Sequence, residues 1–180
     1  MHYRRAAAAG ATYFFTLVTH ERQRLFDDAT NIDRWRRAVT KVQRPRPFSV
    51  DAEVILPDHL HVLWSLPDHD SDYATRIRVV KTAFTKSLDL SHRGSSSVSR
   101  KAKGERDVWQ RRYWEHMIRD ERDFRVHLDY IHYNPVKHGF VARATDWPWS
   151  TLRDWIERGT YDADWGADVL PELPEWRGRE

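Results

Sequence analysis

Apolar and polar residues follow two distinct patterns along this chain, and these patterns predict its strands and helices. Four segments are rich in β-branched and aromatic residues or alternate with a period of two, as strands do: 12–19, 49–56, 59–66 and 107–118. Apolar residues at steps of three and four predict helices that begin at Asn31, after Asp72, and at Arg119. The order of elements is therefore β-α-β-β-α-β, followed by a further helix.

Turn-forming residues separate these elements. The Arg44–Pro47 segment breaks the first helix, and Pro57-Asp58 is a tight connection between the second and third strands, which we expect to pair as an antiparallel hairpin. Residues 91–106 are rich in Ser, Gly, Lys and Arg and predict a flexible basic loop. The helix over 119–133 is expected to end at Asn134-Pro135, because a proline disfavours the helical conformation of the residue before it.

This order of elements predicts an α+β, ferredoxin-like fold, in which a four-stranded antiparallel sheet carries two helices on one face. The other face is then open and able to hold a site. At 180 residues and 40% hydrophobic content, the chain is long enough for one domain with a real core. We assign this domain to residues 1–156 and an acidic tail to residues 157–180.

The charge of the chain is unevenly distributed. Residues 157–180 contain seven acidic residues and three arginines, a net charge of −4. Since the whole chain carries +3, residues 1–156 carry +7. A basic body is typical of proteins that bind polyanions, although a soluble protein with a mildly basic surface has the same balance.

The composition also excludes some kinds of chemistry. The chain contains no cysteine, which rules out disulfides, thiolate metal ligands and a cysteine nucleophile. No segment resembles a signal peptide or a membrane span. We therefore expect a cytoplasmic protein with no membrane partner.

Two histidines in the third strand form the main candidate site. They occur in the sequence PDHLHVLW, where one apolar residue separates His59 from His61. Successive side chains of a strand point to opposite faces, so both histidines project from one face while Leu60 and Trp64 face the core. Two imidazoles side by side on an open sheet face are suitably spaced to bind one metal ion or one phosphate. The alternative is that both are simply polar residues of a solvated strand face.

The last predicted helix carries a second group of polar residues. Its core stripe consists of Phe124, Leu128 and Ile131. At about 100° per residue, His127, Tyr130 and Asn134 form another stripe a quarter turn away. A tyrosine hydroxyl can act as a nucleophile, and a nearby metal can activate both the hydroxyl and its target. The alternative is a partly exposed amphipathic helix in which Asn134 caps a following short helix that begins with a proline.

Three separated blocks of the sequence are similar to one known family: PDHLHVLWSLP, WQRRYWEHMIRDERDFRVHLDYIHYNPVKHGFV and DWPWS. Together they closely resemble the REP-associated tyrosine transposases. These belong to the single-tyrosine group of HUH endonucleases and are related to the transposases of small insertion sequences. The resemblance extends from Tyr3 to about Trp165, and residues 91–106 look like a local insertion within it.

The resemblance implies a single-strand DNA nicking and joining enzyme. His59 and His61 match the HUH motif, Tyr130 matches the nucleophile and Asn134 matches the third metal ligand. The resemblance therefore implies that the helix of Tyr130 lies near the histidine pair. His127 is a candidate accessory residue. The family is associated with Mg²⁺ or Mn²⁺, although two imidazoles and an amide suit zinc, nickel or copper better.

The resemblance also implies a partner, a repetitive extragenic palindrome in the form of a DNA hairpin with a characteristic tetranucleotide at its foot. It suggests a monomer, associated with the nucleoid when bound to DNA. Basic residues near the inferred site or on basic faces are candidate phosphate contacts, and each is equally compatible with a solvated surface. They are Arg4, Arg5, Arg78, Lys81, Arg111, Arg112 and Lys137.

Two other functions compete with this one. One alternative is a domesticated protein that binds palindromic DNA without cutting it, although the intact His59, His61, Tyr130 and Asn134 argue against it. A histidine-triad nucleotide hydrolase is disfavoured, because its third histidine would fall at Leu63.

Overall fold

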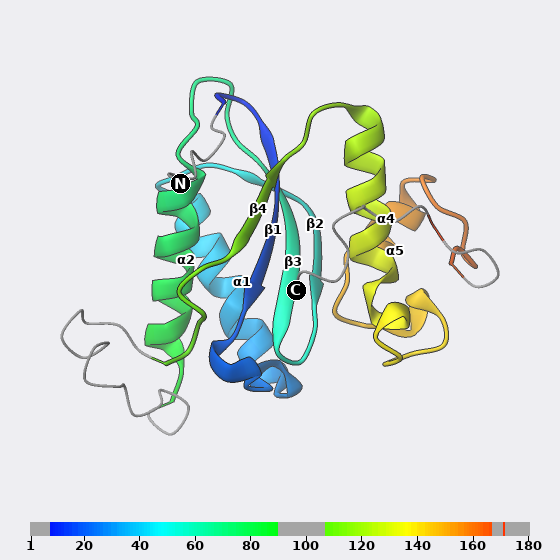
Figure 1. The fold of residues 1–180 in the computed structure, drawn as a ribbon, viewed down its shortest axis with the longest axis horizontal. Helices are drawn as coiled ribbons and strands as arrows, with labels where there is room; N and C mark the ends of the chain where they lie inside the picture. The colour runs from blue at the N-terminus through cyan, green and yellow to red at the C-terminus, as the bar shows by residue number, and fades with distance from the viewer. Residues whose placement is uncertain (1–7, 90–106, 167–170, 172–180) are drawn as a thin grey trace, which may run out of the picture.

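Four strands of the chain form one antiparallel sheet in the order β2-β3-β1-β4 (Figure 1). The computed structural model describes residues 8–89, 107–166 and 171. The strands are β1 (Thr12–Val18), β2 (Ser49–Ile55), β3 (His59–Ser65) and β4 (Trp114–Met117). The second and third strands pair as the predicted hairpin. The element order and sheet order together confirm the ferredoxin-like α+β fold.

Helices cover both faces of this sheet. On one side lie α1 (Ala29–Gln43) and α2 (Tyr73–Ser87), and on the other lie α4 (Glu121–Lys137) and α5 (Leu152–Glu157) (Figure 1). Short 3₁₀ turns complete the described elements: η1 (His20–Arg22), η2 (Leu25–Asp27) and η4 (Ala144–Asp146). No helix of the described residues is long and apolar enough to cross a membrane.

The alternation along β3 divides its side chains between two cores. Leu60, Val62 and Trp64 pack in the core beneath α1 and α2, as the sequence pattern predicts. Leu63 and Phe14 belong to the core beneath α4. The second face of the sheet is therefore covered, and the prediction of an open face around the histidines is wrong. Hydropathy indicates the face to which a side chain points, but does not indicate what packs on that face.

Aspartates begin the three long helices. The side chains of Asp28, Asp72 and Asp120 accept hydrogen bonds from backbone N–H groups of Thr30, Thr75 and Asp123. Such caps satisfy N–H groups that have no partner within the helix. The predicted cap at Asp72 is confirmed.

The structure extends α4 through Pro135, so the predicted end at Asn134-Pro135 is wrong. A proline removes only its own N–H, and its effect on the preceding residue is a bias that burial can outweigh. Both Asn134 and Pro135 are buried. The helix ends instead at Lys137, two residues before Gly139, which has a φ of 70°. There, Phe140 N donates to Pro135 O at 2.9 Å and Gly139 N donates to Val136 O at 2.9 Å, the Schellman pattern that favours glycine.

The bounds of the fourth strand also differ from the prediction. The fourth strand covers only 114–117 of the predicted 107–118, since the preceding segment touches the sheet mainly through Trp109, which bridges to Thr19. The predicted loop at 91–106 lies outside the described residues. Of the predicted tail, residues 157–166 and 171 are described, and Tyr161 is buried there and donates its hydroxyl to Asp129.

Candidate active site

His59 and His61 lie side by side on β3, beneath α4. Their ring centroids are 5.1 Å apart at an interplanar angle of 83°. They pair with Val18 and Thr16 of β1, in the middle of the sheet. Only 1% of His59 and none of His61 is exposed. The two imidazoles are therefore held in a buried position between sheet and helix.

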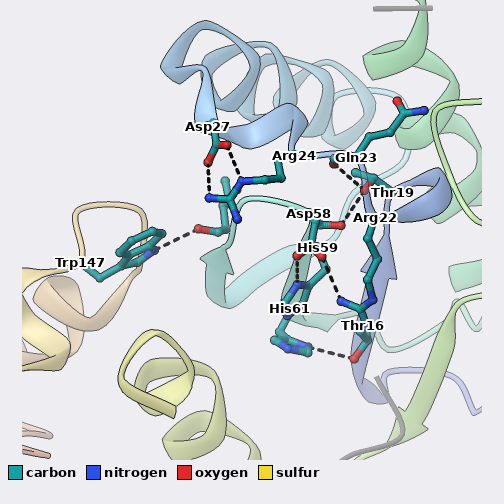
Figure 2. Close-up of polar contacts among 11 residues, drawn as sticks. Thr16, Thr19, Arg22, Gln23, Arg24, Asp27, Asp58, His59, His61 and Trp147 are labelled. Atoms are coloured by element: carbon teal, nitrogen blue, oxygen red, sulfur yellow. Dashed lines mark hydrogen bonds and ion pairs between the residues drawn. The ribbon is translucent and has the colours of Figure 1, made fainter. Parts of the chain in front are cut away.

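Hydrogen bonds fix the orientation of both rings (Figure 2). His59 Nδ1 lies 2.6 Å from Asp58 Oδ1, and His61 Nδ1 lies 2.9 Å from Thr16 Oγ1. An ionised carboxylate only accepts hydrogen bonds, so Nδ1 of His59 is the donor of this bond. A histidine held in this way by a carboxylate is typical of metal ligands.

Asp58 is itself held in place from two sides. Its carboxylate accepts a hydrogen bond from Arg22 at 3.1 Å, and its carbonyl oxygen accepts from the backbone N–H and the hydroxyl of Thr19 (Figure 2). Burial by itself raises the pKa of Asp58, but hydrogen bonds and charges from His59 and Arg22 outweigh this and lower the pKa to about 2. The carboxylate is therefore ionised at neutral pH.

α4 packs over the histidines and carries Tyr130 and, one turn later, Asn134. Neither residue is exposed. The ring of Tyr130 meets that of His61 with 5.2 Å between centroids. Within the described residues, neither side-chain polar atom of Asn134 makes a hydrogen bond. A buried amide in this state costs about 1–3 kcal/mol, so the position favours a ligand that would satisfy it.

The site therefore contains two imidazoles whose Nδ1 atoms are already engaged, and one amide oxygen. Nitrogen and oxygen donors of this kind suit a divalent metal ion. Burial, and then repulsion from the neighbouring cations Lys137 and Arg22, lowers the pKa of His61 well below its usual value. This keeps His61 neutral near pH 7, in the form that binds metals.

Two residues at the end of α4 adjoin this group. Lys137 Nζ donates a hydrogen bond to Tyr130 Oη at 3.0 Å and lies 4.8 Å from the centroid of the ring. The ring of His138 lies 5.2 Å from that of His59. Burial, and then the charges of His59 and Lys137, lower the pKa of His138 to about 4. His138 was not predicted from the sequence. It follows Asn134 by one helical turn, and this spacing is the signal that could have identified it.

His127 lies in a different cluster, with His116 of β4 and Asp123 of α4. His116 Nε2 lies 2.8 Å from Asp123 Oδ2, and His127 Nδ1 lies 3.2 Å from Asp123 Oδ1. The ligand atoms of the three residues are within 4.8 Å of one another, close enough to hold a metal ion. However, the two imidazoles are stacked, 4.6 Å apart at 11°, so their lone pairs lie in nearly parallel planes. As it stands, the cluster is a hydrogen-bonded link between β4 and the start of α4.

Phe14 separates this cluster from the first. Its ring lies 5.4 Å from that of His61 and 5.0 Å from that of His127. The structure therefore brings His59, His61 and Tyr130 together, buries Asn134 one helical turn after Tyr130, and places His127 on the other side of Phe14.

The predicted phosphate contacts occupy several parts of the molecule. Arg4 and Arg5 lie outside the described residues. Arg78 and Lys81 are on α2, across the sheet from the histidines, and Lys81 Nζ donates to the carbonyl oxygen of Gln110. Arg111 and Arg112 are exposed just before β4. Lys137 adjoins Tyr130 and is the member of this set that contacts the site.

Comparison with known proteins gives close relatives over nearly the full length. The REP-associated tyrosine transposase of Escherichia coli (strain K12) is 42% identical over 168 residues, which are 93% of this chain and 92% of the relative. A putative REP-associated tyrosine transposase of Haemophilus influenzae (strain ATCC 51907 / DSM 11121 / KW20 / Rd) is 42% identical over 172 residues, 96% of each chain. No protein-family model matches the sequence.

A solved structure, described as a REP-associated tyrosine transposase bound to a REP hairpin, has the same fold. It matches with a TM-score of 0.75 and 38% identity, over 97% of both chains. These relatives define a class of transposases, enzymes that cleave nucleic acid. The chain belongs to the REP-associated tyrosine transposases.

Proposed function

We propose that this protein is a metal-dependent single-strand DNA endonuclease and strand-transferase of the HUH class, with Tyr130 as its nucleophile. The observation that carries the proposal is the contact between the rings of Tyr130 and His61, whose centroids are 5.2 Å apart. The ring of the second histidine, His59, lies 5.1 Å from that of His61. Nucleophile and metal ligands in one buried group provide what a phosphoryl transfer needs, a positioned oxygen and a means of stabilising charge on the phosphate.

Nε2 of His59, Nε2 of His61 and Oδ1 of Asn134 would hold the metal ion. A bound Mg²⁺ or Mn²⁺ would polarise the scissile phosphate and stabilise negative charge on its oxygens. Asp58 and Thr16 would keep the two imidazoles in the orientation that presents Nε2, through the hydrogen bonds described above.

Tyr130 would perform the covalent step. Its Oη attacks phosphorus, the bond from phosphorus to the 3′-oxygen breaks, and a 5′-phosphotyrosine forms. The proton lost by the phenol is balanced by the proton that the released 3′-hydroxyl gains. The reverse attack by a 3′-hydroxyl rejoins DNA and restores Tyr130, so the cycle needs no external energy source.

The substrate class follows from the family and from the related structure bound to a REP hairpin. We propose that this chain, as a monomer, also acts on a palindromic DNA hairpin with a single-stranded foot. The exposed residues Lys137 and His138 adjoin the buried nucleophile and histidines, so the scissile phosphate would approach past them.

The test is cleavage of labelled hairpin oligonucleotides by the full-length protein with Mg²⁺, with Mn²⁺ and with EDTA. We expect metal-dependent cleavage and a covalent adduct between protein and the 5′-phosphate fragment that withstands denaturing electrophoresis. Tight hairpin binding without cleavage in either metal would overturn the nuclease proposal. It would support the alternative, a domesticated protein that binds palindromic DNA without cutting it.

A further inference from the structure

Lys137 and Tyr130 are neighbours because α4 continues past Pro135. Seven residues are about two turns of a helix, so Lys137 returns to the face that carries Tyr130. Its Nζ is 3.0 Å from Tyr130 Oη and 4.8 Å from the ring centroid. A helix that ended at Asn134 would not bring the ammonium group to this oxygen. The contact is therefore a direct product of how the helix ends.

We propose that Lys137 is a catalytic residue that acts on the reacting oxygen of Tyr130, an inference that rests on the proposed function. In cleavage, the Lys137 ammonium orients Oη through its hydrogen bond and stabilises the negative charge that develops on this oxygen as its proton is lost. In rejoining, the same oxygen is the leaving group, and Lys137 stabilises the charge that it regains when its bond to phosphorus breaks. Lys137 keeps its own proton throughout.

The surroundings of the pair strengthen this interaction. Tyr130 is fully buried, packed against Phe14 and His61, and an ion–phenol contact is stronger in such a low-dielectric setting than in water. His61 and His59 on β3 and His138 at the end of α4 are further ionisable groups around the pair. Beyond them, the carboxylate of Asp58 is paired with His59 and Arg22. Lys137 contacts Oη directly, with a fixed positive charge.

An ammonium group has three N–H donors, so holding Oη leaves donors for a phosphate oxygen. A role in DNA contact alone is thus the competing interpretation of Lys137. The two roles differ in what they change. A phosphate contact contributes to hairpin affinity, whereas stabilisation of Oη contributes to the rate of the bound complex.

The experiment compares Lys137→Met and Lys137→Arg with the native protein, using single-turnover cleavage at saturating hairpin. It also measures rejoining, by adding a 3′-hydroxyl strand to the isolated covalent adduct. We expect Lys137→Met to slow both steps by about 100-fold, the size typical of losing one donor to a developing oxyanion. Hairpin affinity should change by less than about threefold, and Lys137→Arg, which keeps the charge, should recover part of both rates.

Lys41→Met is the matched control. It removes a lysine that is exposed on α1, across the sheet from the site, and should leave both rates unchanged. Circular dichroism of each variant would verify its fold, which the exposed position of Lys137 should preserve. Weaker hairpin binding with unchanged saturated rates in Lys137→Met would overturn the catalytic role in favour of DNA contact. If the native protein itself fails to cleave, it is the proposed nuclease function that fails.

Discussion

The phenol of Tyr130 meets the imidazole of His61 nearly edge to face, at an interplanar angle of 69°. The two residues come from the last long helix and the third strand, elements that are separated in the chain by α2 and β4. Their contact exists because α4 packs on the face of the sheet opposite α1 and α2. The site is thus assembled by the second layer of helices.

Tyr130→Phe should abolish cleavage while hairpin affinity stays within about threefold of the native value. The substitution removes only the hydroxyl, and affinity for nucleic acid comes mainly from phosphate contacts elsewhere. The measurement is formation of the covalent adduct on a denaturing gel, beside a binding titration. Tyr133→Phe, on the same helix but partly exposed, is the control and should cleave normally. A covalent adduct in the Tyr130→Phe protein would show that another residue is the nucleophile.

Replacing either histidine with alanine should have two separable effects. We expect His59→Ala and His61→Ala to lose metal-dependent cleavage, because each removes one imidazole ligand. Both residues are buried, so each variant should also lose about 1–3 kcal/mol of unfolding free energy, measured by urea denaturation. Asn134→Ala should impair metal use less, since an amide is a weaker ligand than an imidazole.

A titration of Mn²⁺ in the cleavage assay would compare these variants. The metal assignment predicts that Asn134→Ala needs a higher Mn²⁺ concentration but keeps measurable activity. Cleavage by the native protein that is unchanged in EDTA would contradict the assignment outright.

Much of the fold could be predicted because local signals and packing agree. The period-two alternation in β3 correctly separated Leu60 and Trp64 from the two histidines, and Asp72 correctly marked the start of α2. The same signals failed at Asn134-Pro135. There, a local preference of the backbone competes with the burial of a whole helical turn, and the burial prevails.

The sequence selected the candidate residues and predicted the helix of Tyr130 near the histidine pair, but it did not predict the burial of the histidines. His61, Tyr130 and Asn134 could be selected by residue type and spacing, but the covering of the histidines by α4 depends on tertiary packing. The contact between Lys137 and Tyr130 depends in turn on where the helix ends. Residue spacing shows which side chains share a face, and the atoms that meet across two elements are fixed only by their docking.

Acid should destabilise the protein partly through Asp70. A hydrogen bond from the buried guanidinium of Arg76, at 2.7 Å, and one from the backbone of Asp72 lower the pKa of Asp70 to about 2. Since this lies below the ordinary aspartate pKa of about 3.9, the stabilisation is complete above that value and is lost as pH falls towards 2.

Unfolding by urea between pH 5 and pH 2 would test this. Asp70→Asn should be less stable than the native protein at pH 5, and this difference should shrink as pH falls through the window between about 4 and 2. Asp33→Asn, which alters an exposed aspartate on α1, should keep the native pH dependence. A difference between Asp70→Asn and the native protein that is constant with pH would contradict the assigned role.

Gly139→Ala should weaken the end of α4 and, with it, catalysis. Gly139 adopts a φ of 70°, which strains any residue with a Cβ, while nothing lies within 4 Å of the position that a Cβ would take. The expected loss of unfolding free energy is therefore the backbone term alone, about 1 kcal/mol. Gly159 offers a matched control, since it has a φ of 74°, equally open space, and a position after α5.

Both glycine variants should lose similar stability in urea, because the strain at the two positions is alike. Only Gly139→Ala should also slow single-turnover cleavage, by several fold. The Schellman turn at Gly139 fixes the last turn of α4, and this turn sets the position of Lys137 relative to Tyr130. Equal cleavage rates in the two variants, at equal cost in stability, would show that the geometry of this helix end is not needed for the reaction.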